Sequence, residues 1–277
     1  MKIAAILTCY NRKEKTLECL HSLFTILPSC EVYLVDDAST DGTLEAVSGL
    51  FPSVNIIKGD GTLFWSRGMF TAWQAARKQD YDYYLWLNDD IQLYPYCIEE
   101  LLECCEWGES KCIISGLIEN FEKTEILYGG YDNRKRLIQP HDQPQEIRLM
   151  NGNVVLVPKY VVDHIGIIDQ VYHHDLGDVD YGLSAQKAGL KVLSTRKAVA
   201  AGYSNKICRV RKWDSSFAER FKRLYSPLGS DPGTNFYYRN KNFGFVNASC
   251  YWLYLHFINM LPDIVVMRIW GDIYCDK

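Results

Sequence analysis

Short apolar runs alternate with helix-like segments along the first half of the chain, and this alternation constrains the fold more than any other feature. Residues 2–8 form a continuous apolar run, which is typical of a strand that is buried on both faces. Residues 13–27 follow with apolar side chains at helical spacing. Because strands that are joined through helices favour right-handed crossovers, the pattern predicts an α/β fold with a mainly parallel sheet flanked by helices.

The same succession continues toward the C-terminus and gives the other elements that we expect. Further strands are predicted at residues 31–35, 54–58, 83–87, 111–115, 154–158 and 191–194. One helix is predicted to end at residue 50 after a cap at Thr40 or Asp41, and others lie at residues 69–78, 95–107, 159–165 and 179–188. We expect a main domain over residues 1–205 and a helical region over residues 206–277 that packs on it.

The composition is that of an ordinary globular protein and narrows the class of partner. Of the 277 residues, 48% are hydrophobic and 23% are charged, and the formal net charge is −4. These values exclude a disordered or low-complexity chain, and the acidic balance argues against a nucleic-acid partner. None of the ten cysteines forms a CxxC pair, and the first apolar run is too short for a signal peptide. We therefore expect reduced thiols in a cytoplasmic protein, either buried as small apolar side chains or inert at the surface.

Positive charge is concentrated in the C-terminal region. Residues 206–241 contain nine Lys or Arg against three Asp or Glu, and residues 243–270 are rich in aromatic and aliphatic side chains. Pro262 and Asp263 interrupt this second segment, which argues against a transmembrane helix. Two interpretations fit the pattern: peripheral contact with the anionic inner face of the cell membrane, or a C-terminal helix that packs on the core.

Polar clusters follow four of the predicted strands, at residues 8–12, 36–43, 59–67 and 88–90. Ligands of parallel α/β sheets bind beyond these strand ends, so we expect one binding site there, although such residues also form ordinary turns and caps. Asp36 and Asp37 can accept hydrogen bonds from a nucleobase or a ribose. In the segment GDGTLFWSRGM, glycines allow close approach of the backbone, Trp65 can stack on a sugar or base, and Arg67 can contact a phosphate.

Asn88-Asp89-Asp90 follows directly after the apolar run YYLWL. Two adjacent carboxylates repel one another unless a cation or hydrogen-bond donors offset their charge. A divalent cation, Mg²⁺ or Mn²⁺, that is shared with substrate phosphates would meet this need, and an ordinary acidic turn is the alternative.

A second acidic cluster, HHDLGDVDY, occupies residues 173–181 and leads into a predicted helix. Asp178 lies near the helix N-terminus, where the helix dipole favours its ionised form, and an ionised carboxylate can act as a general base. His173 and His174 are candidate metal ligands, although adjacent residues seldom bind one ion together.

Taken together, these motifs resemble those of the inverting family 2 glycosyltransferases, whose GT-A fold is a Rossmann-like sheet that binds nucleotide-diphosphate-sugars. The resemblance spans residues 1–205 and is carried by LTCYNRKEKTLECL, VDDASTDGT, GDGTLFWSRGM, YLWLNDDIQLYP, NGNVVLVPK and HHDLGDVDYGLSAQKAGLKV. The segments GDGTLFWSRGM and GDVDYGL look most like the bacterial rhamnosyltransferase-like branch, which builds surface polysaccharides.

The resemblance implies a UDP- or dTDP-sugar donor, a divalent metal and a glycan or polyprenyl-diphosphate-linked acceptor. It implies that Asp36 or Asp37 contacts the base, that Asp89 approaches the ribose and that Asp90 holds the metal. Asp178 matches the catalytic base. The other expected donor-site residues are Thr8, Tyr10, Arg12, Gly61, Trp65 and Arg67. Contacts to the acceptor or the diphosphate are expected from His174, Asp180, Arg239 and Asn240.

The chain departs from the family pattern at three positions. Gly177 stands where many members have Glu, Gln186 stands where an Arg is common, and Asn88 removes one acid from the fuller motif. The expected reaction is metal-assisted sugar transfer to a hydroxyl with inversion, in cell-surface polysaccharide synthesis. A nucleotidyltransferase and a non-catalytic sugar-nucleotide-binding protein are the alternatives, although a nucleotidyltransferase usually carries a glycine-rich loop where this chain has TCYNRKEK.

Overall fold

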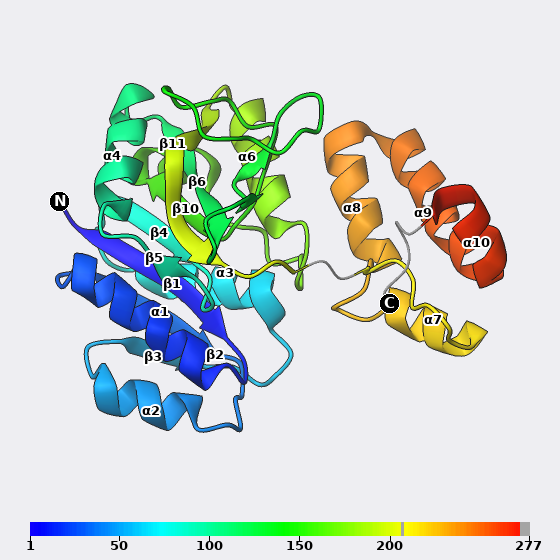
Figure 1. Ribbon diagram of the computed structural model, residues 1–277, viewed down its shortest axis with the longest axis horizontal. Coiled ribbons are helices and arrows are strands. Elements are labelled where there is room, and N and C mark those ends of the chain that lie inside the picture. The colour runs from blue at the N-terminus through cyan, green and yellow to red at the C-terminus, as the bar shows by residue number, and fades with distance from the viewer. Residues whose placement is uncertain (206–207, 272–277) are drawn as a thin grey trace. The chain divides into compact units, whose positions relative to one another are not determined.

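The computed structural model describes residues 1–205 and 208–271, which form two compact units (Figure 1). The first unit comprises residues 1–170 and 177–204. The second unit comprises residues 171–176 and the described residues from 205 onward. The short segment 171–176 thus belongs to the second unit, although both of its ends continue into the first.

The N-terminal half of the first unit is built from parallel strands that are joined by helices. The strands are β1 (Ile3–Cys9), β2 (Glu31–Asp36), β3 (Asn55–Lys58) and β4 (Tyr83–Leu87). The helices between them are α1 (Lys13–Ile26), α2 (Thr43–Leu50) and α3 (Phe64–Ala76). β1 pairs in parallel with β2 and β4, and β2 pairs in parallel with β3. The carboxyl ends of four neighbouring strands therefore meet at one edge of the sheet.

The other half of the sheet is mixed. Its strands are β5 (Gln92–Leu93), β6 (Cys112–Asn120), β7 (Ile126–Tyr128), β10 (Val154–Pro158) and β11 (Lys191–Gly202). The order is β3-β2-β1-β4-β10-β6-β11-β5, and β7 pairs with β6. β10 runs antiparallel to both β4 and β6, a direction that its uniformly apolar sequence does not specify. The remaining elements of this unit are β8 (Gly130–Tyr131), β9 (Leu149–Met150), α4 (Cys97–Trp107), α5 (Lys159–Ile165) and α6 (Gly177–Lys187).

Both faces of the sheet are buried. Along β1, Ala5 and Leu7 pack toward α1 and α4, whereas Ala4 and Ile6 pack toward α3, α5 and α6. This two-sided burial explains why the strands are continuous apolar runs rather than alternating ones. Seven of the nine cysteines in the described residues are buried thiols, and Cys275 lies outside those residues.

Two predicted helix starts are wrong. α3 begins at Phe64, five residues earlier than predicted, because the carboxylate of Asp37 accepts the first N–H groups of its opening turn. α2 is capped by Gly42, whose φ of +83° suits glycine, and not by Thr40 or Asp41. Asp41 instead accepts the backbone N–H groups of Lys13 and Thr43, at 3.0 Å each, and so fixes the starts of two helices.

The second unit is helical. It contains α7 (Phe217–Leu224), α8 (Pro232–Phe243), α9 (Phe245–Met260) and α10 (Asp263–Trp270). Ser216 and Glu219 form a capping box at α7, and Asp231 caps α8 by accepting the N–H of Thr234 at 2.7 Å. The fully buried Arg211 contacts Asp263. No helix in the described ranges is long and apolar enough to span a bilayer.

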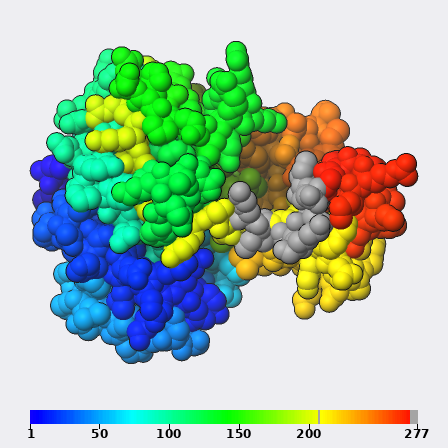
Figure 2. Space-filling model, viewed as in Figure 1, coloured from blue at the N-terminus to red at the C-terminus, as the bar shows by residue number. Residues whose placement is uncertain are grey.

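The predicted α/β fold with a helical C-terminal part is therefore confirmed. The segment between β6 and β10, in which the sequence shows no regular alternation, forms much of the visible surface of the first unit (green in Figure 2). It carries only the short strands β7, β8 and β9, and its last residues, Gly152 and Asn153, reach the carboxyl edge of β4, where Asn153 contacts Asn88.

Candidate active site

The loop before α3 is anchored by Asp37, one of the two acids that end β2. Its carboxylate is buried and accepts N–H groups from Gly61 at 2.9 Å, Leu63 at 3.0 Å and Phe64 at 2.9 Å. Its neighbour Asp36 is also buried, and among the described residues its carboxylate accepts one backbone N–H, from Ser39 at 3.1 Å. The two acids thus differ in role, because Asp37 holds the loop whereas Asp36 retains acceptor capacity at the end of the strand.

The guanidinium of Arg12 joins the two acids that follow β4. Its Nη1 lies 3.1 Å from Asp89 Oδ1 and 2.8 Å from Asp90 Oδ2. Asp89 is almost fully buried, and this burial raises its pKa to about 7, although the charge of Arg12 acts in the opposite direction. The like-charge repulsion that the sequence implied is therefore offset by a side chain of the protein.

The same pair of acids was predicted to hold a metal ion. No group of three or more His, Cys, Asp and Glu side chains within residues 1–205 and 208–271 could hold one. The chemistry of the donor set nevertheless fits Mg²⁺ or Mn²⁺, because the hard carboxylate oxygens of Asp89 and Asp90 are adjacent and Asp90 is partly exposed. Such ions are commonly held by one or two carboxylates, with substrate phosphates and water completing the shell.

Asn88 connects these acids to the opposite side of the site. Its Oδ1 accepts the indole N–H of Trp65 at 2.8 Å, and its Nδ2 donates to Asn153 Oδ1 at 2.6 Å. An aspartate could not be the donor in the second contact, because an ionised carboxylate has no hydrogen to donate, and the contact would form only if the Asn153 amide reversed. The departure from the acidic family motif therefore has a local structural reason.

Asp178 lies in the first turn of α6, where it was predicted. Its Oδ2 accepts the N–H of Gly152 at 2.8 Å, and its Oδ1 accepts the N–H of Val179 at 2.8 Å. Burial raises the pKa of Asp178 above its ordinary value, although these two N–H groups act against that shift. The helix dipole alone would favour the ionised form, so desolvation has the larger influence here.

Gly152 brings the two acidic motifs together. A Cβ atom at this position would lie 2.6 Å from the ring of Trp65 and 3.0 Å from Cβ of Asp178. The next residue, Asn153, is the partner of Asn88. One turn of the chain thus links Asp178 to the Asn88-Asp89-Asp90 segment, although these lie far apart in the sequence.

The family is shown by a match over most of the first unit. Residues 4–166 match the model of glycosyl transferase family 2. The chain belongs to this family. Its predicted membership is therefore confirmed, whereas the rhamnosyltransferase-like branch stays a prediction. A search of curated proteins gives no match.

Several crystal structures of S. aureus TarS share the fold of this family member. The first aligns with 98% of this chain and 46% of its own, at 12% identity and a TM-score of 0.57, so this chain spans less than half of that protein. A structure of TarS 1–349 aligns over 98% of this chain and 78% of its own, with 12% identity and a TM-score of 0.58. The same fragment in complex with UDP-GlcNAc aligns over 96% and 83%, with 14% identity and a TM-score of 0.56.

The other predicted donor-site residues of this family 2 member lie around the same strand ends. Thr8 is buried against α3, where a Cβ atom on Gly68 would come within 2.3 Å of its hydroxyl. Tyr10 exposes 55% of its surface just beyond β1. Arg67 donates from Nε to the carbonyl of Gln170 at 3.2 Å.

The predicted acceptor or diphosphate contacts divide between the two units. Asp180 is buried on α6 of the first unit. Arg239, in the second unit, stacks on Tyr251 with 3.4 Å to the ring centroid. Asn240 uses its backbone carbonyl to accept the N–H of Gly244 at the end of α8.

His174 contacts an arginine that forms an ion pair with Asp175 within the second unit, a contact that the sequence did not predict. Arg209 Nε lies 2.8 Å from Asp175 Oδ2, and Nη2 of the same arginine lies 3.1 Å from His174 Nε2. The excess of basic residues after position 206 was the only signal for such a partner, and it does not indicate which residue is involved.

Proposed function

We propose that this protein transfers a sugar from a nucleotide-diphosphate donor to a hydroxyl of a glycan or lipid-linked glycan, with inversion, in cell-surface polysaccharide synthesis. The observation that carries the proposal is the hydrogen-bonded connection from Asp178 through Gly152 and Asn153 to Asn88. This connection couples a candidate base to a candidate diphosphate site. The TarS structures with UDP-GlcNAc and UDP support a nucleotide-sugar donor for a chain of this fold.

The donor would lie along the carboxyl ends of β1, β2 and β4. Of the two acids at the end of β2, we assign the base contact to Asp36, because Asp37 already accepts three backbone N–H groups. The exposed ring of Tyr10 is available for stacking on the base. The backbone at Gly61, in the loop before α3, and Arg67, in the first turn of α3, would face the sugar and phosphates.

A divalent cation would be held by Asp90, with Asp89 beside it and the donor phosphates completing its shell. When bound, such an ion neutralises the charge that develops on the departing diphosphate. Arg12 has a related electrostatic function, because its guanidinium already contacts both acids and is also suited to phosphate oxygens.

Asp178 would accept the proton of the acceptor hydroxyl while that oxygen bonds to the anomeric carbon and the bond to the diphosphate breaks. One displacement of this kind inverts the configuration. A raised pKa makes the carboxylate a stronger base, and the N–H groups of Gly152 and Val179 keep it in a fixed orientation.

The first test is a thermal-shift screen of UDP- and dTDP-sugars with and without Mn²⁺, since a ligand of the folded state raises apparent stability. The rhamnosyltransferase-like resemblance makes these donors the ones to test first. Release of UDP or dTDP in the presence of acceptor supports the proposal. A nucleotidyltransferase would instead release inorganic pyrophosphate when it is given a nucleoside triphosphate and a sugar 1-phosphate. Binding without turnover would favour a non-catalytic protein.

For the second unit, we propose peripheral contact with an anionic membrane from the cytoplasmic side. In sequence, the basic segment 206–241 is followed by helices that expose large apolar side chains, among them Phe245, Val246, Leu253, Phe257, Met260 and Ile264. Apolar side chains beside Lys and Arg favour the interface of an anionic bilayer. Co-sedimentation with vesicles should require anionic lipid and decrease with salt, and binding that depends on neither would contradict the proposal.

A further inference from the structure

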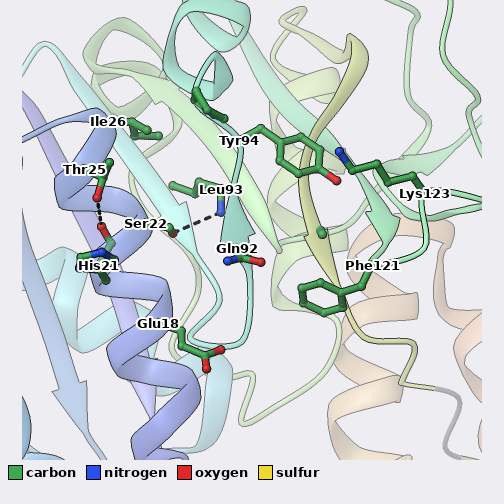
Figure 3. Close-up of a pocket in the computed structure, with 12 residues that line it drawn as sticks. Glu18, His21, Ser22, Thr25, Ile26, Gln92, Leu93, Tyr94, Phe121 and Lys123 are labelled. Carbon is green, nitrogen blue, oxygen red and sulfur yellow. Dashed lines mark hydrogen bonds between the residues drawn. The ribbon is translucent and has the colours of Figure 1, made fainter.

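A pocket of about 540 Å³ lies in the first unit, between α1, β5 and the turn that follows β6 (Figure 3). Figure 3 shows the α1 side chains on one side of β5 and the side chains of Tyr94, Phe121 and Lys123 on the other. Neither Asp178 nor the Asn88-Asp89-Asp90 segment lines it. We refer to it as the α1–β5 pocket.

The aromatic wall of the α1–β5 pocket is accessible and fixed. Phe121 exposes 39% of its surface and packs against Tyr203, with 4.7 Å between the ring centroids. Tyr94 is oriented by its hydroxyl, which donates to Glu119 at 2.7 Å. The ammonium of Lys123 lies 4.7 Å from the centroid of the Tyr94 ring, and a contact of this kind limits the motion of a long side chain.

The opposite wall is mostly polar, although Ile26 and Leu93 also line it. Glu18 and His21 project from α1, and Gln92 comes from β5 (Figure 3). Within the described chain, the side chains of Glu18 and Gln92 have no hydrogen-bond partner, so their carboxylate and amide groups are available to a ligand. Aromatic rings opposite a few polar groups are the usual lining of a small-molecule site, and the volume lies in the usual range.

This combination fits a pyranose better than other ligands of the same size. A pyranose offers an apolar C–H face to an aromatic ring and hydroxyls around its rim to carboxylate, amide and imidazole groups. A phosphate-bearing ligand would meet the carboxylate of Glu18 and only one lysine, Lys123, among the lining residues. A lipid chain would leave the same polar groups without partners.

The α1–β5 pocket is built from the two segments that carry the proposed diphosphate site. α1 follows Arg12, which contacts Asp89 and Asp90, and Gln92 lies two residues after Asp90. Two residues of extended chain span at most about 7 Å. The N–H of Leu93 donates to Ser22 of α1 at 3.2 Å and holds the two segments together.

We propose that the α1–β5 pocket binds a pyranose unit of the acceptor glycan, at a distance along the glycan from the hydroxyl that receives the sugar. The identification of this glycan as the acceptor rests on the proposed function. The binding of a saccharide to the α1–β5 pocket does not, because it requires neither donor nor turnover.

The experiment is saturation-transfer NMR on the full chain without nucleotide. The probes are maltotetraose, chitotetraose and a hyaluronan tetrasaccharide, which represent neutral, N-acetylated and acidic glycans. At least one should bind, and Phe121→Ala should weaken that binding roughly 3- to 10-fold, as expected for the loss of one aromatic contact. Tyr94→Ala should have a similar effect, and Tyr94→Phe, which keeps the ring, should retain most of the binding.

The matched control is Tyr160→Ala, which removes another partly exposed tyrosine with a lysine ammonium, that of Lys111, 5.8 Å from its ring. This variant should bind as the parent does. Binding of none of the three probes, or equal binding by Phe121→Ala and the parent, would overturn the proposal.

A second measurement separates this proposal from the proposed function. With an acceptor in hand, Phe121→Ala should raise the KM for acceptor while kcat and the affinity for UDP stay unchanged. If the parent binds saccharide but no nucleotide, the proposed function is contradicted, whereas saccharide binding by the α1–β5 pocket is supported. The parent could instead bind nucleotide and transfer sugar, while Phe121→Ala leaves saccharide binding and the KM for acceptor unchanged. That result would contradict the proposal for the α1–β5 pocket and would support the proposed function.

Discussion

Two acidic centres of the first unit stabilise their carboxylates by different means. Asp89 and Asp90 share the guanidinium of Arg12, a long side chain that is 43% exposed. Asp178 is held by the N–H groups of Gly152 and Val179, which are fixed parts of the backbone. A side-chain cation can exchange one anionic partner for another, whereas backbone N–H groups keep their geometry. The first centre therefore suits a ligand that arrives and departs, and the second suits a group that must stay in one orientation.

Asp178→Asn should show the largest effect on activity. We expect kcat to fall about 10³-fold, because the amide cannot accept the proton of the acceptor, while affinity for the donor changes less than about twofold. The measurements are the rate of sugar transfer and a titration with UDP. Asp163→Asn, which alters an exposed acid on α5, is the matched control and should leave both unchanged. A proportional loss of transfer and UDP binding would refute the assignment of the base.

Arg12→Ala tests the first centre, in which Arg12 contacts Asp89 and Asp90. Without the guanidinium, Asp89 is a buried carboxylate with no cation, and we expect donor affinity to fall about 10- to 100-fold. Arg12→Lys should recover only part of this loss, because an ammonium lacks the planar fork that contacts two acids. Exposed Arg77→Ala is the control for removal of an arginine. If Arg12→Ala lowers thermal stability but leaves UDP affinity intact, the arginine serves folding alone.

The contrast between the centres also shows what the sequence could and could not predict. The positions of Asp89 and Asp90 after a strand, and of Asp178 at the start of a helix, follow from apolar runs and helix starts, which are local patterns. The partners of these acids are not local, because Arg12 is 77 residues from Asp89 and Gly152 is 26 residues from Asp178. Hydrogen bonds of this kind depend on how the strands are ordered, and no spacing rule encodes that order.

The fold, like the site, could be predicted where it depends on local sequence patterns and not where it depends on contacts between distant residues. The parallel half follows from strand–helix alternation, whose crossovers have one preferred hand. The antiparallel direction of β10 was not predictable, because a strand that is buried on both faces has a uniformly apolar sequence whether it runs parallel or antiparallel to its neighbours. The early start of α3 depends on Asp37, a residue outside the helix, so the helical periodicity of residues 69–78 could not reveal it.

A pH series tests whether burial determines the pKa of Asp89 in the first centre. Asp89 has a pKa of about 7 in the folded chain, against about 3.9 for an unperturbed aspartate in the unfolded chain. Between these values the folded state binds a proton that the unfolded state has released. The stability from this group is therefore fully present below about pH 4 and is lost as the pH rises through about 7.

Asp89→Asn removes this titration, so the stability of the variant relative to the parent should improve from about pH 5 to about pH 8. Urea unfolding of both proteins across this range measures the difference. A difference that does not change with pH would mean that Asp89 has an ordinary pKa and that Arg12 outweighs its burial.

Asn88→Asp should have the smallest effect on activity. It tests whether the two acidic centres are coupled, because Asn88 lies between them. The aspartate can still accept the indole N–H of Trp65, but it loses the donor that contacts Asn153 and adds a third negative charge beside Asp89. We expect kcat to fall about 3- to 10-fold, since the turn that orients Asp178 loses one contact. Affinity for Mn²⁺ in the presence of UDP should rise, because a carboxylate is a better ligand for a hard cation than an amide. Opposite changes in kcat and metal affinity would show that Asn88 couples the centres, whereas a fall in metal affinity would place the cation away from this segment.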